Sequence, residues 1–92
     1  NSISGSVYPN PAVRNMAVSY NVPDKLDHLE ITIWNVQGKM VFNLFHGAES
    51  AGTHNRTWNG RDHENRDLPA GTYIMRFRTG VRHFETKFSI VK

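Results

Sequence analysis

WNGRDHENRDLPAGTY, residues 58–73, decides how the fold is interpreted, because a polar loop stands here between two segments of strand character. Residues 53–58 alternate in polarity before the loop, and residues 71–79 place large apolar side chains at every second position after it. A period of two predicts a strand on each side. Gly60 gives the backbone freedom to turn, and Pro69 fixes φ just before the second strand. The stretch therefore predicts a long hairpin connection.

Three acidic residues in this loop, Asp62, Glu64 and Asp67, allow two interpretations. Their side chains can accept hydrogen bonds from nearby backbone N–H groups and so shape turns. Alternatively, oxygen ligands at alternate positions can bind calcium. The central glycine and distal glutamate of a twelve-residue calcium loop are missing from this spacing, so we expect turn bonding.

Outward from the loop, the same alternation recurs along the chain, and no segment has a helical period. The predicted strands are residues 16–22, 29–35, 40–45, 53–58, 71–79 and 82–91, with 3–8 as a weaker seventh. A short turn at residues 36–39 predicts that 29–35 and 40–45 form a hairpin. Short strands at this spacing predict an all-β fold, an immunoglobulin-like antiparallel β-sandwich of about seven strands. We assign residues 1–6 to a linker and 7–92 to the sandwich.

The inward positions of these strands define the predicted core. It consists of Val18, Tyr20, Val22, Leu29, Ile31, Ile33, Val41 or Phe42, Leu44, Tyr73, Met75, Phe77, Phe84, Phe88 and Ile90. Trp58 is expected to cap this core where the long loop begins.

Composition limits the classes of function. The 92 residues make one domain, and the net charge of +3 comes from interspersed charges rather than from a Lys/Arg run typical of nucleic-acid binding. Cysteine is absent, so a disulfide framework is excluded. No apolar run approaches the roughly 20 residues that span a bilayer. Asn1 is not an initiator methionine, so we expect a piece of a longer protein.

The sequence offers no catalytic signature, and we predict neither an enzyme nor a cofactor. Its serines lack a glycine elbow, and a sandwich this small has little room for paired carboxylates across a cleft. Five histidines are present, yet none forms a close pair with metal-ligand spacing, so no metal site is predicted and scattered surface positions are expected. They are His28, His46, His54, His63 and His83.

Trp34 falls on the face opposite Ile31 and Ile33, and an outward aromatic ring on a flat sheet can stack on a sugar. With Tyr20 or an arginine on the same sheet it would form a polysaccharide-binding surface. The alternative is that Trp34 covers an apolar edge or packs under a neighbouring loop.

Five motifs in order carry a family resemblance: YPNPA at 8–12, NVQGKMV at 35–41, WNGRD at 58–62, LPAGTY at 68–73 and TKFSIVK at 86–92. Together they resemble the C-terminal sorting domains of proteins exported by the type IX secretion system of Bacteroidetes and related bacteria. They are also similar to the immunoglobulin-like module of flagellar hook-capping proteins. One departure is Asn65, where the family commonly has glycine; asparagine tolerates the same left-handed backbone.

The resemblance implies a module at the C-terminus of a larger protein that is secreted or surface-attached after passing through the periplasm. Its partners would be the type IX outer-membrane translocon and a sortase. The implied recognition residues are Pro9, Asn10, Pro11, Gly71, Tyr73, Lys87 and Lys92. A carbohydrate-binding module or a structural spacer on a secreted polysaccharide-degrading enzyme is the alternative.

Overall fold

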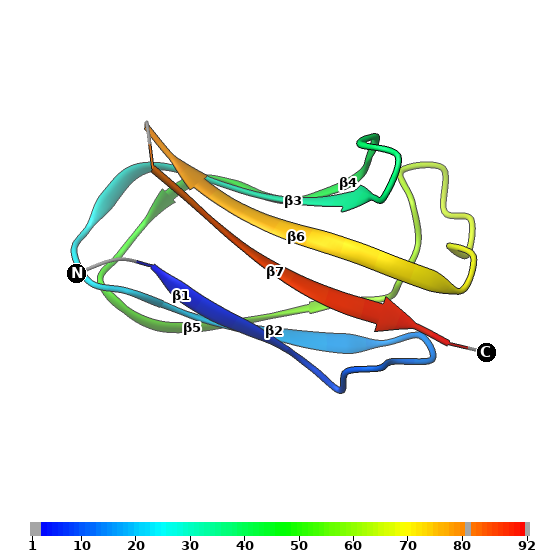
Figure 1. Cartoon of the computed structure of the whole chain (residues 1–92). Coiled ribbons are helices and arrows are strands. Elements are labelled where there is room, and N and C mark those ends of the chain that lie inside the picture. Colours follow the sequence, from blue (N-terminus) through cyan, green and yellow to red (C-terminus); the bar gives the residue numbers. More distant parts are fainter. Residues whose placement is uncertain (1–2, 81, 92) are drawn as a thin grey trace.

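A computed structural model describes residues 3–80 and 82–91 of the chain. It contains β1 (Ser4–Tyr8), β2 (Met16–Val22), β3 (Leu26–Asn35), β4 (Met40–Glu49), β5 (Gly52–Trp58), β6 (Gly71–Thr79) and β7 (Arg82–Ile90). They form a three-stranded sheet in the order β1-β2-β5 and a four-stranded sheet in the order β4-β3-β6-β7, stacked as two layers (Figure 1). All named pairs are antiparallel, so the predicted all-β antiparallel sandwich is confirmed. Across the described ranges, no helix has the length and apolar character to cross a membrane.

The hairpin of β3 and β4 is confirmed, and one side chain shapes its turn. Asn35 Oδ1 accepts hydrogen bonds from the backbone N–H groups of Gln37 and Lys39, both at 3.0 Å. An Asn side chain that bonds its own following backbone stabilises a tight turn. The NVQGK sequence thus fixes where β3 ends and β4 begins.

The predicted hairpin across residues 59–70 is wrong. β5 pairs with β2 in the three-stranded sheet, whereas β6 lies between β3 and β7 in the other sheet. Residues 59–70 therefore cross from one layer to the other (Figure 1). Alternation identifies the inward face of a strand but not the strand it pairs with. Trp58 and Tyr73 both face inward, from opposite sheets.

Within this connection, Asp62 shapes a turn, which is the role predicted for it from the sequence. Its Oδ1 accepts hydrogen bonds from the N–H groups of Arg66 at 3.0 Å and Glu64 at 2.9 Å. These two bonds hold the pKa of Asp62 below its ordinary value, and the bond from the Arg66 N–H has the larger effect. Asn65 has the predicted positive φ, 63°.

The first strand corrects the linker assignment for residues 4–6, and residues 1–2 of that assignment lie outside the described residues. β1 begins at Ser4 and pairs with β2 from Ser4 opposite Asn21 to Tyr8 opposite Ala17. Residues 4–6 are therefore part of the sheet, and the weaker prediction of a strand at 3–8 is confirmed. The alternating pattern of this strand is weak in the sequence, because its residues are mostly small and polar and only Val7 places a large side chain in the core.

The core agrees with the prediction except along the sheet edges. The predicted members on β2, β3 and β6, together with Phe88 and Ile90, are buried. Four further predicted members are only partly buried, because β4 and β7 form the edges of the four-stranded sheet: Val41, Phe42, Leu44 and Phe84. Trp58 is buried as expected, whereas four other core residues were not predicted: Val7, Ala12, Met16 and Leu68.

A polar cluster joins the two sheets beside this core; we call it the Glu49 network, and it comprises Tyr20, Glu49, His54 and Arg56. The Tyr20 hydroxyl donates to Glu49 Oε2 at 2.5 Å, and Arg56 donates to Glu49 Oε2 at 3.1 Å and to the Tyr20 oxygen at 2.9 Å. His54 Nδ1 lies 3.5 Å from Glu49 Oε1. The guanidinium also lies over the ring of Phe45, 3.8 Å from its centroid. Because Glu49 belongs to β4 and the others to β2 and β5, the network connects the layers.

Charge and burial compete within the network. Burial alone would raise the pKa of Glu49, but hydrogen bonds from Tyr20 and Arg56 and the nearby positive charges outweigh it and lower that pKa. Burial and the hydrogen bond to Glu49 raise the pKa of Tyr20 to about 12. The network therefore holds an ionised carboxylate whose side chain is only 10% exposed.

The sandwich has two ends that lie far apart in space. β3 and β7 begin at the end that holds the N-terminal segment, which we call the amino-terminal end; the Glu49 network lies there (Figure 1). β3 and β7 finish at the opposite, carboxyl-terminal end, which also receives the loop after β1 and the 59–70 connection (Figure 1).

Candidate functional site

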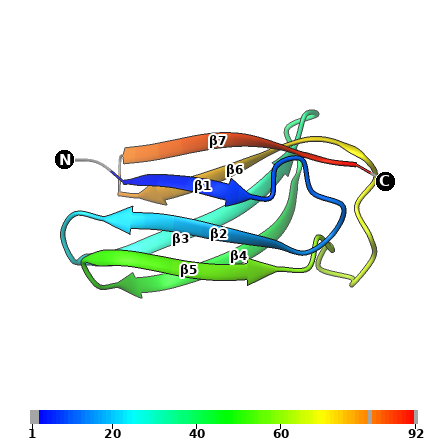
Figure 2. The same ribbon diagram turned by 90° about the horizontal axis from the view of Figure 1, so that it is seen from below.

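The segment after β1 packs against the last strand of the chain (Figure 2). Ala12 forms a parallel bridge with Ile90: its N–H donates to Ser89 O at 2.9 Å, and its carbonyl accepts from Val91 N–H at 2.8 Å. The peptide bonds preceding Pro9 and Pro11 are cis. The bridge and its two hydrogen bonds hold Ala12 beside the end of β7.

Asn10 ties this segment to β7 with its side chain. Its Oδ1 accepts from the N–H of Ser89 at 3.0 Å, and its Nδ2 lies 3.5 Å from the carbonyl of Lys87. The asparagine between the two prolines thus satisfies backbone groups on the free side of β7. We call the surface formed by Pro9, Asn10, Pro11, Ala12 and β7 from Lys87 to Ile90 the entry seam.

Gly71 and Tyr73 lie on the other side of β7. Gly71 pairs with Ile90 and Tyr73 with Phe88. Tyr73 is buried, and its hydroxyl donates to Pro69 O at 2.6 Å, the tyrosine-corner arrangement of sandwich domains. Burial raises the pKa of this hydroxyl. Tyr73 therefore supports β7 from the core and is not available to a partner.

Glycine is needed at position 71 because of the backbone dihedral, not because neighbouring atoms leave no room for a side chain. Its φ is 155°, and a Cβ there would meet no atom within 4 Å. Side chains rarely adopt this dihedral, so the glycine allows the chain to enter β6 after Pro69.

Four of the five exposed members of the predicted set within the described residues gather on one surface; the fifth, Gly71, lies on β6. Pro9, Asn10, Pro11 and Lys87 are all exposed along the entry seam, although 77 residues separate Asn10 from Lys87. Lys92 lies outside the described residues. The structure thus brings together both ends of the chain that the resemblance implied for recognition.

Two exposed apolar side chains beside the seam were missed by the sequence reasoning. Tyr8 is 77% exposed and Val13 is 69% exposed, one on each side of the two prolines. Their exposure could have been predicted from the sequence, because each is an apolar residue that flanks a proline-rich segment without strand periodicity. Tyr8 and Pro9 also border an open groove of about 780 Å³, whose other walls include Phe42 and Trp58. The seam and these two flanking residues therefore present polar, cationic and apolar groups to solvent.

The predicted sugar-binding pair does not come together. Tyr20 lies on β2 and is buried, whereas Trp34 lies on β3 in the other sheet. The expectation of a shared sheet is wrong for Tyr20, because alternation gives no sheet membership. Trp34 is half-buried; its Nε1 donates to Thr32 Oγ1 at 2.9 Å, and the Arg76 guanidinium lies 4.9 Å from the ring centroid. One face of the ring is therefore already covered by Arg76.

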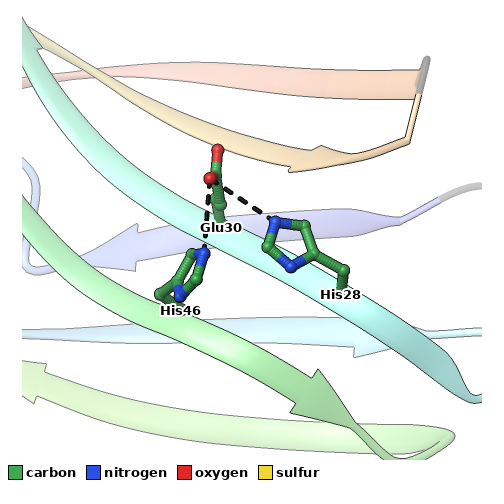
Figure 3. Close-up of side chains that lie close together, drawn as sticks. All are labelled: His28, Glu30 and His46. Atoms are coloured by element: carbon green, nitrogen blue, oxygen red, sulfur yellow. Dashed lines mark ion pairs between the residues drawn. The ribbon is translucent and has the colours of Figure 1, made fainter.

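The histidines are not all scattered. The rings of His28 and His46 lie 4.6 Å apart between centroids, and Glu30 lies beside both (Figure 3). Such nitrogen and carboxylate donors can hold a metal ion. By contrast, His63 stacks on Phe42 at 5.2 Å at the carboxyl-terminal end. The expectation of scattered positions is wrong for His28 and His46, because spacing along the sequence does not show which strands pair.

Comparison with known proteins identifies the module. Residues 7–78 match the family model of the FlgD Ig-like domain. No curated protein matches the sequence. The crystal structure of FlgD from P. aeruginosa has a TM-score of 0.65 and 18% identity, covering 98% of this chain and 77% of that one. PorZ of Porphyromonas gingivalis, described as a surface component of its type IX secretion system, has a TM-score of 0.61 and 16% identity. That match covers 97% of this chain and 12% of PorZ. These similarities support the predicted immunoglobulin-like fold.

Proposed function

This chain belongs to the family of FlgD Ig-like domains, and on that premise we propose that it is a non-catalytic C-terminal sorting domain. In this proposal it directs an upstream cargo through the periplasm and the type IX outer-membrane translocon. A sortase then leaves the cargo secreted or attached at the cell surface. The observation that carries the proposal is the entry seam, where Asn10 and Ala12 are hydrogen-bonded to β7.

The seam supports recognition for a structural reason. A translocon that reads a folded domain needs a surface whose shape does not vary between molecules, since ordering a loose segment costs binding free energy. Four hydrogen bonds fix residues 10–12 against residues 87–91. Lys87 contributes an exposed cation to the same seam, and the two prolines have fixed φ. The similarity to a module in PorZ, a component of such a secretion system, agrees with this setting.

The test is export of a reporter. A periplasmic reporter protein is fused ahead of residues 1–92 and expressed in a type IX-competent bacterium. The fraction of reporter outside the outer membrane is then measured by fractionation and by surface protease access. We expect most of the reporter to leave the periplasm; complete retention would contradict the proposal.

A matched pair of variants tests the seam itself. Lys87→Glu reverses a charge on the entry seam, and Lys25→Glu makes the same change at an exposed position between β2 and β3, at the opposite end. The first is expected to lower the exported fraction several-fold and the second to leave it unchanged. Equal export by both variants would exclude Lys87 from recognition.

A further inference from the structure

We propose that His28, Glu30 and His46 bind one divalent transition-metal cation of the zinc type on the outer face of the four-stranded sheet. The site lies at the amino-terminal end, away from the entry seam, and it is independent of the sorting function. Its three side chains project from β3 and β4 toward a common point (Figure 3).

The distances between donor atoms fit a metal ion better than direct hydrogen bonds. His28 Nε2 lies 3.5 Å and His46 Nε2 lies 3.6 Å from the same Glu30 oxygen, Oε2. Strong hydrogen bonds to a carboxylate are about 2.7 to 2.9 Å long. Two ligands bound tetrahedrally to zinc, each about 2.0 to 2.1 Å from the ion, stand roughly 3.3 Å apart. All three donors lie within 4.8 Å of one another, so small side-chain rotations bring them onto one ion.

The backbone holds these donors in place. Glu30 and His46 are direct cross-strand partners on β3 and β4, and β3 is itself held on its other side by β6. His28 is two residues from Glu30, so it shares the outer face. A register irregularity between Leu26 and Leu29 leaves Asp27 and His28 themselves without one-to-one partners on β4. Such bulges often re-aim a side chain at a site.

The donor types favour zinc over calcium or magnesium. Two imidazole nitrogens and one carboxylate suit zinc and its neighbours among transition metals, whereas calcium and magnesium prefer six or more oxygen ligands. His28 and His46 side chains are 53% and 56% exposed, which leaves a fourth position for water. Arg78 on β6 is the cross-strand neighbour of Glu30 and carries a positive charge near the site. Its side chain is exposed, so solvent and salt screen that charge.

Calorimetric titration of the 92-residue chain with zinc chloride tests the site. We expect one equivalent to bind to the wild type. His28→Gln, Glu30→Gln and His46→Gln should each weaken binding about tenfold or more, since loss of even an outer-shell partner costs about that much. His63→Gln is the matched control, because it removes an exposed histidine at the other end, and it should bind as the wild type does. Similar affinities across all four variants, or no binding to the wild type, would overturn the proposal.

Nuclear magnetic resonance gives a second readout that does not depend on affinity. At one equivalent of zinc, the imidazole signals of His28 and His46 should shift together, while those of His63 and His83 stay in place. Parallel shifts of all these histidines would indicate non-specific binding and contradict the site. Equal unfolding midpoints in excess chelator would show that the variants remain folded, as expected for exposed positions.

Discussion

The two ends of the sandwich are held together in different ways. At the amino-terminal end, charged side chains join the layers through the Glu49 network. At the carboxyl-terminal end, the buried side chains bond backbone groups: the indole of Trp58 donates to Arg61 O at 3.1 Å, and Tyr73 donates to Pro69 O. The ion pairs of Asp67 with Arg14 and Arg61 at this end are largely exposed to solvent, unlike Glu49. Charged contacts respond to pH and ions, whereas backbone contacts respond to shape. Each end can therefore be perturbed separately.

The largest effect is expected from Trp58→Ala at the carboxyl-terminal end. Trp58 is 3% exposed, stacks on Phe42 at 5.7 Å and meets Phe88 edge-on at 6.0 Å. Its removal leaves a cavity where the two layers and the 59–70 connection meet. Urea unfolding should show a loss of about 3 to 5 kcal/mol in the free energy of unfolding. Trp34→Ala, the half-buried control, should cost about 1 kcal/mol; equal losses would contradict this account of the end.

The next effect is expected from Glu49→Gln at the amino-terminal end. It removes the charge that pairs with Arg56 and should cost about 2 to 3 kcal/mol at pH 7. The exposed pair of Arg76 and Glu85, 2.7 Å apart, is the control: Glu85→Gln should change stability by less than about 1 kcal/mol.

The same variant carries a pH signature that distinguishes the two ends. Because the pKa of Glu49 is lowered in the folded state, its stabilisation is full above the ordinary value of 4.5. It is lost as the pH falls below 4.5 through the folded pKa. The stability difference between wild type and Glu49→Gln should therefore shrink in acid. A difference that stays constant from pH 7 to pH 3 would show that the carboxylate charge is not what Glu49 contributes.

A smaller effect is expected from Gly60→Ala, which tests the dependence of the carboxyl-terminal end on shape. Gly60 has φ +74°, and a Cβ there would lie 2.9 Å from Arg14 O. Gly38, at φ +87°, would place its Cβ in open space. We expect Gly38→Ala to cost about 1 kcal/mol for the dihedral alone and Gly60→Ala about 2 kcal/mol because the backbone must also move. Thermal unfolding of both variants measures the difference, and equal costs would mean that the Arg14 contact is not limiting.

The smallest effect on stability is expected from Asn10→Ala. Its exposed side chain bonds Ser89 N–H, and its loss should cost about 1 kcal/mol. Amide hydrogen exchange should accelerate at Ser89 and leave the strands of the Glu49 network unchanged. Acceleration at both ends alike would show that the entry segment stabilises the whole sandwich rather than one edge.

The sequence predicted the strands better than their arrangement. Alternation revealed the buried faces of β2, β3 and β6, because each strand carries that signal locally. It gave no partner for β5 or β6, so the layer-crossing connection was taken for a hairpin. It placed Tyr20 and Trp34 on one sheet for the same reason.

The candidate sites illustrate the same limit. The motifs at residues 8–12 and 86–92 were visible, but their contact depends on the folded position of β7. His28 and Glu30 share a face of β3, but the predicted strand began at residue 29 and left His28 out. His46 likewise lay beyond the predicted strand 40–45, and register shifts in the β3 and β4 pair decide that it lies opposite Glu30.

The most direct test of the central claim compares export after perturbing each end. The reporter fusion is measured with Asn10→Ala and Lys87→Glu combined, and separately with His28→Gln and His46→Gln combined. Both pairs change exposed side chains, at opposite ends of one sandwich. The account predicts that the first pair leaves the reporter in the periplasm and that the second exports it like the wild type. Normal export by the first pair, or equal loss by both, would contradict recognition through the entry seam.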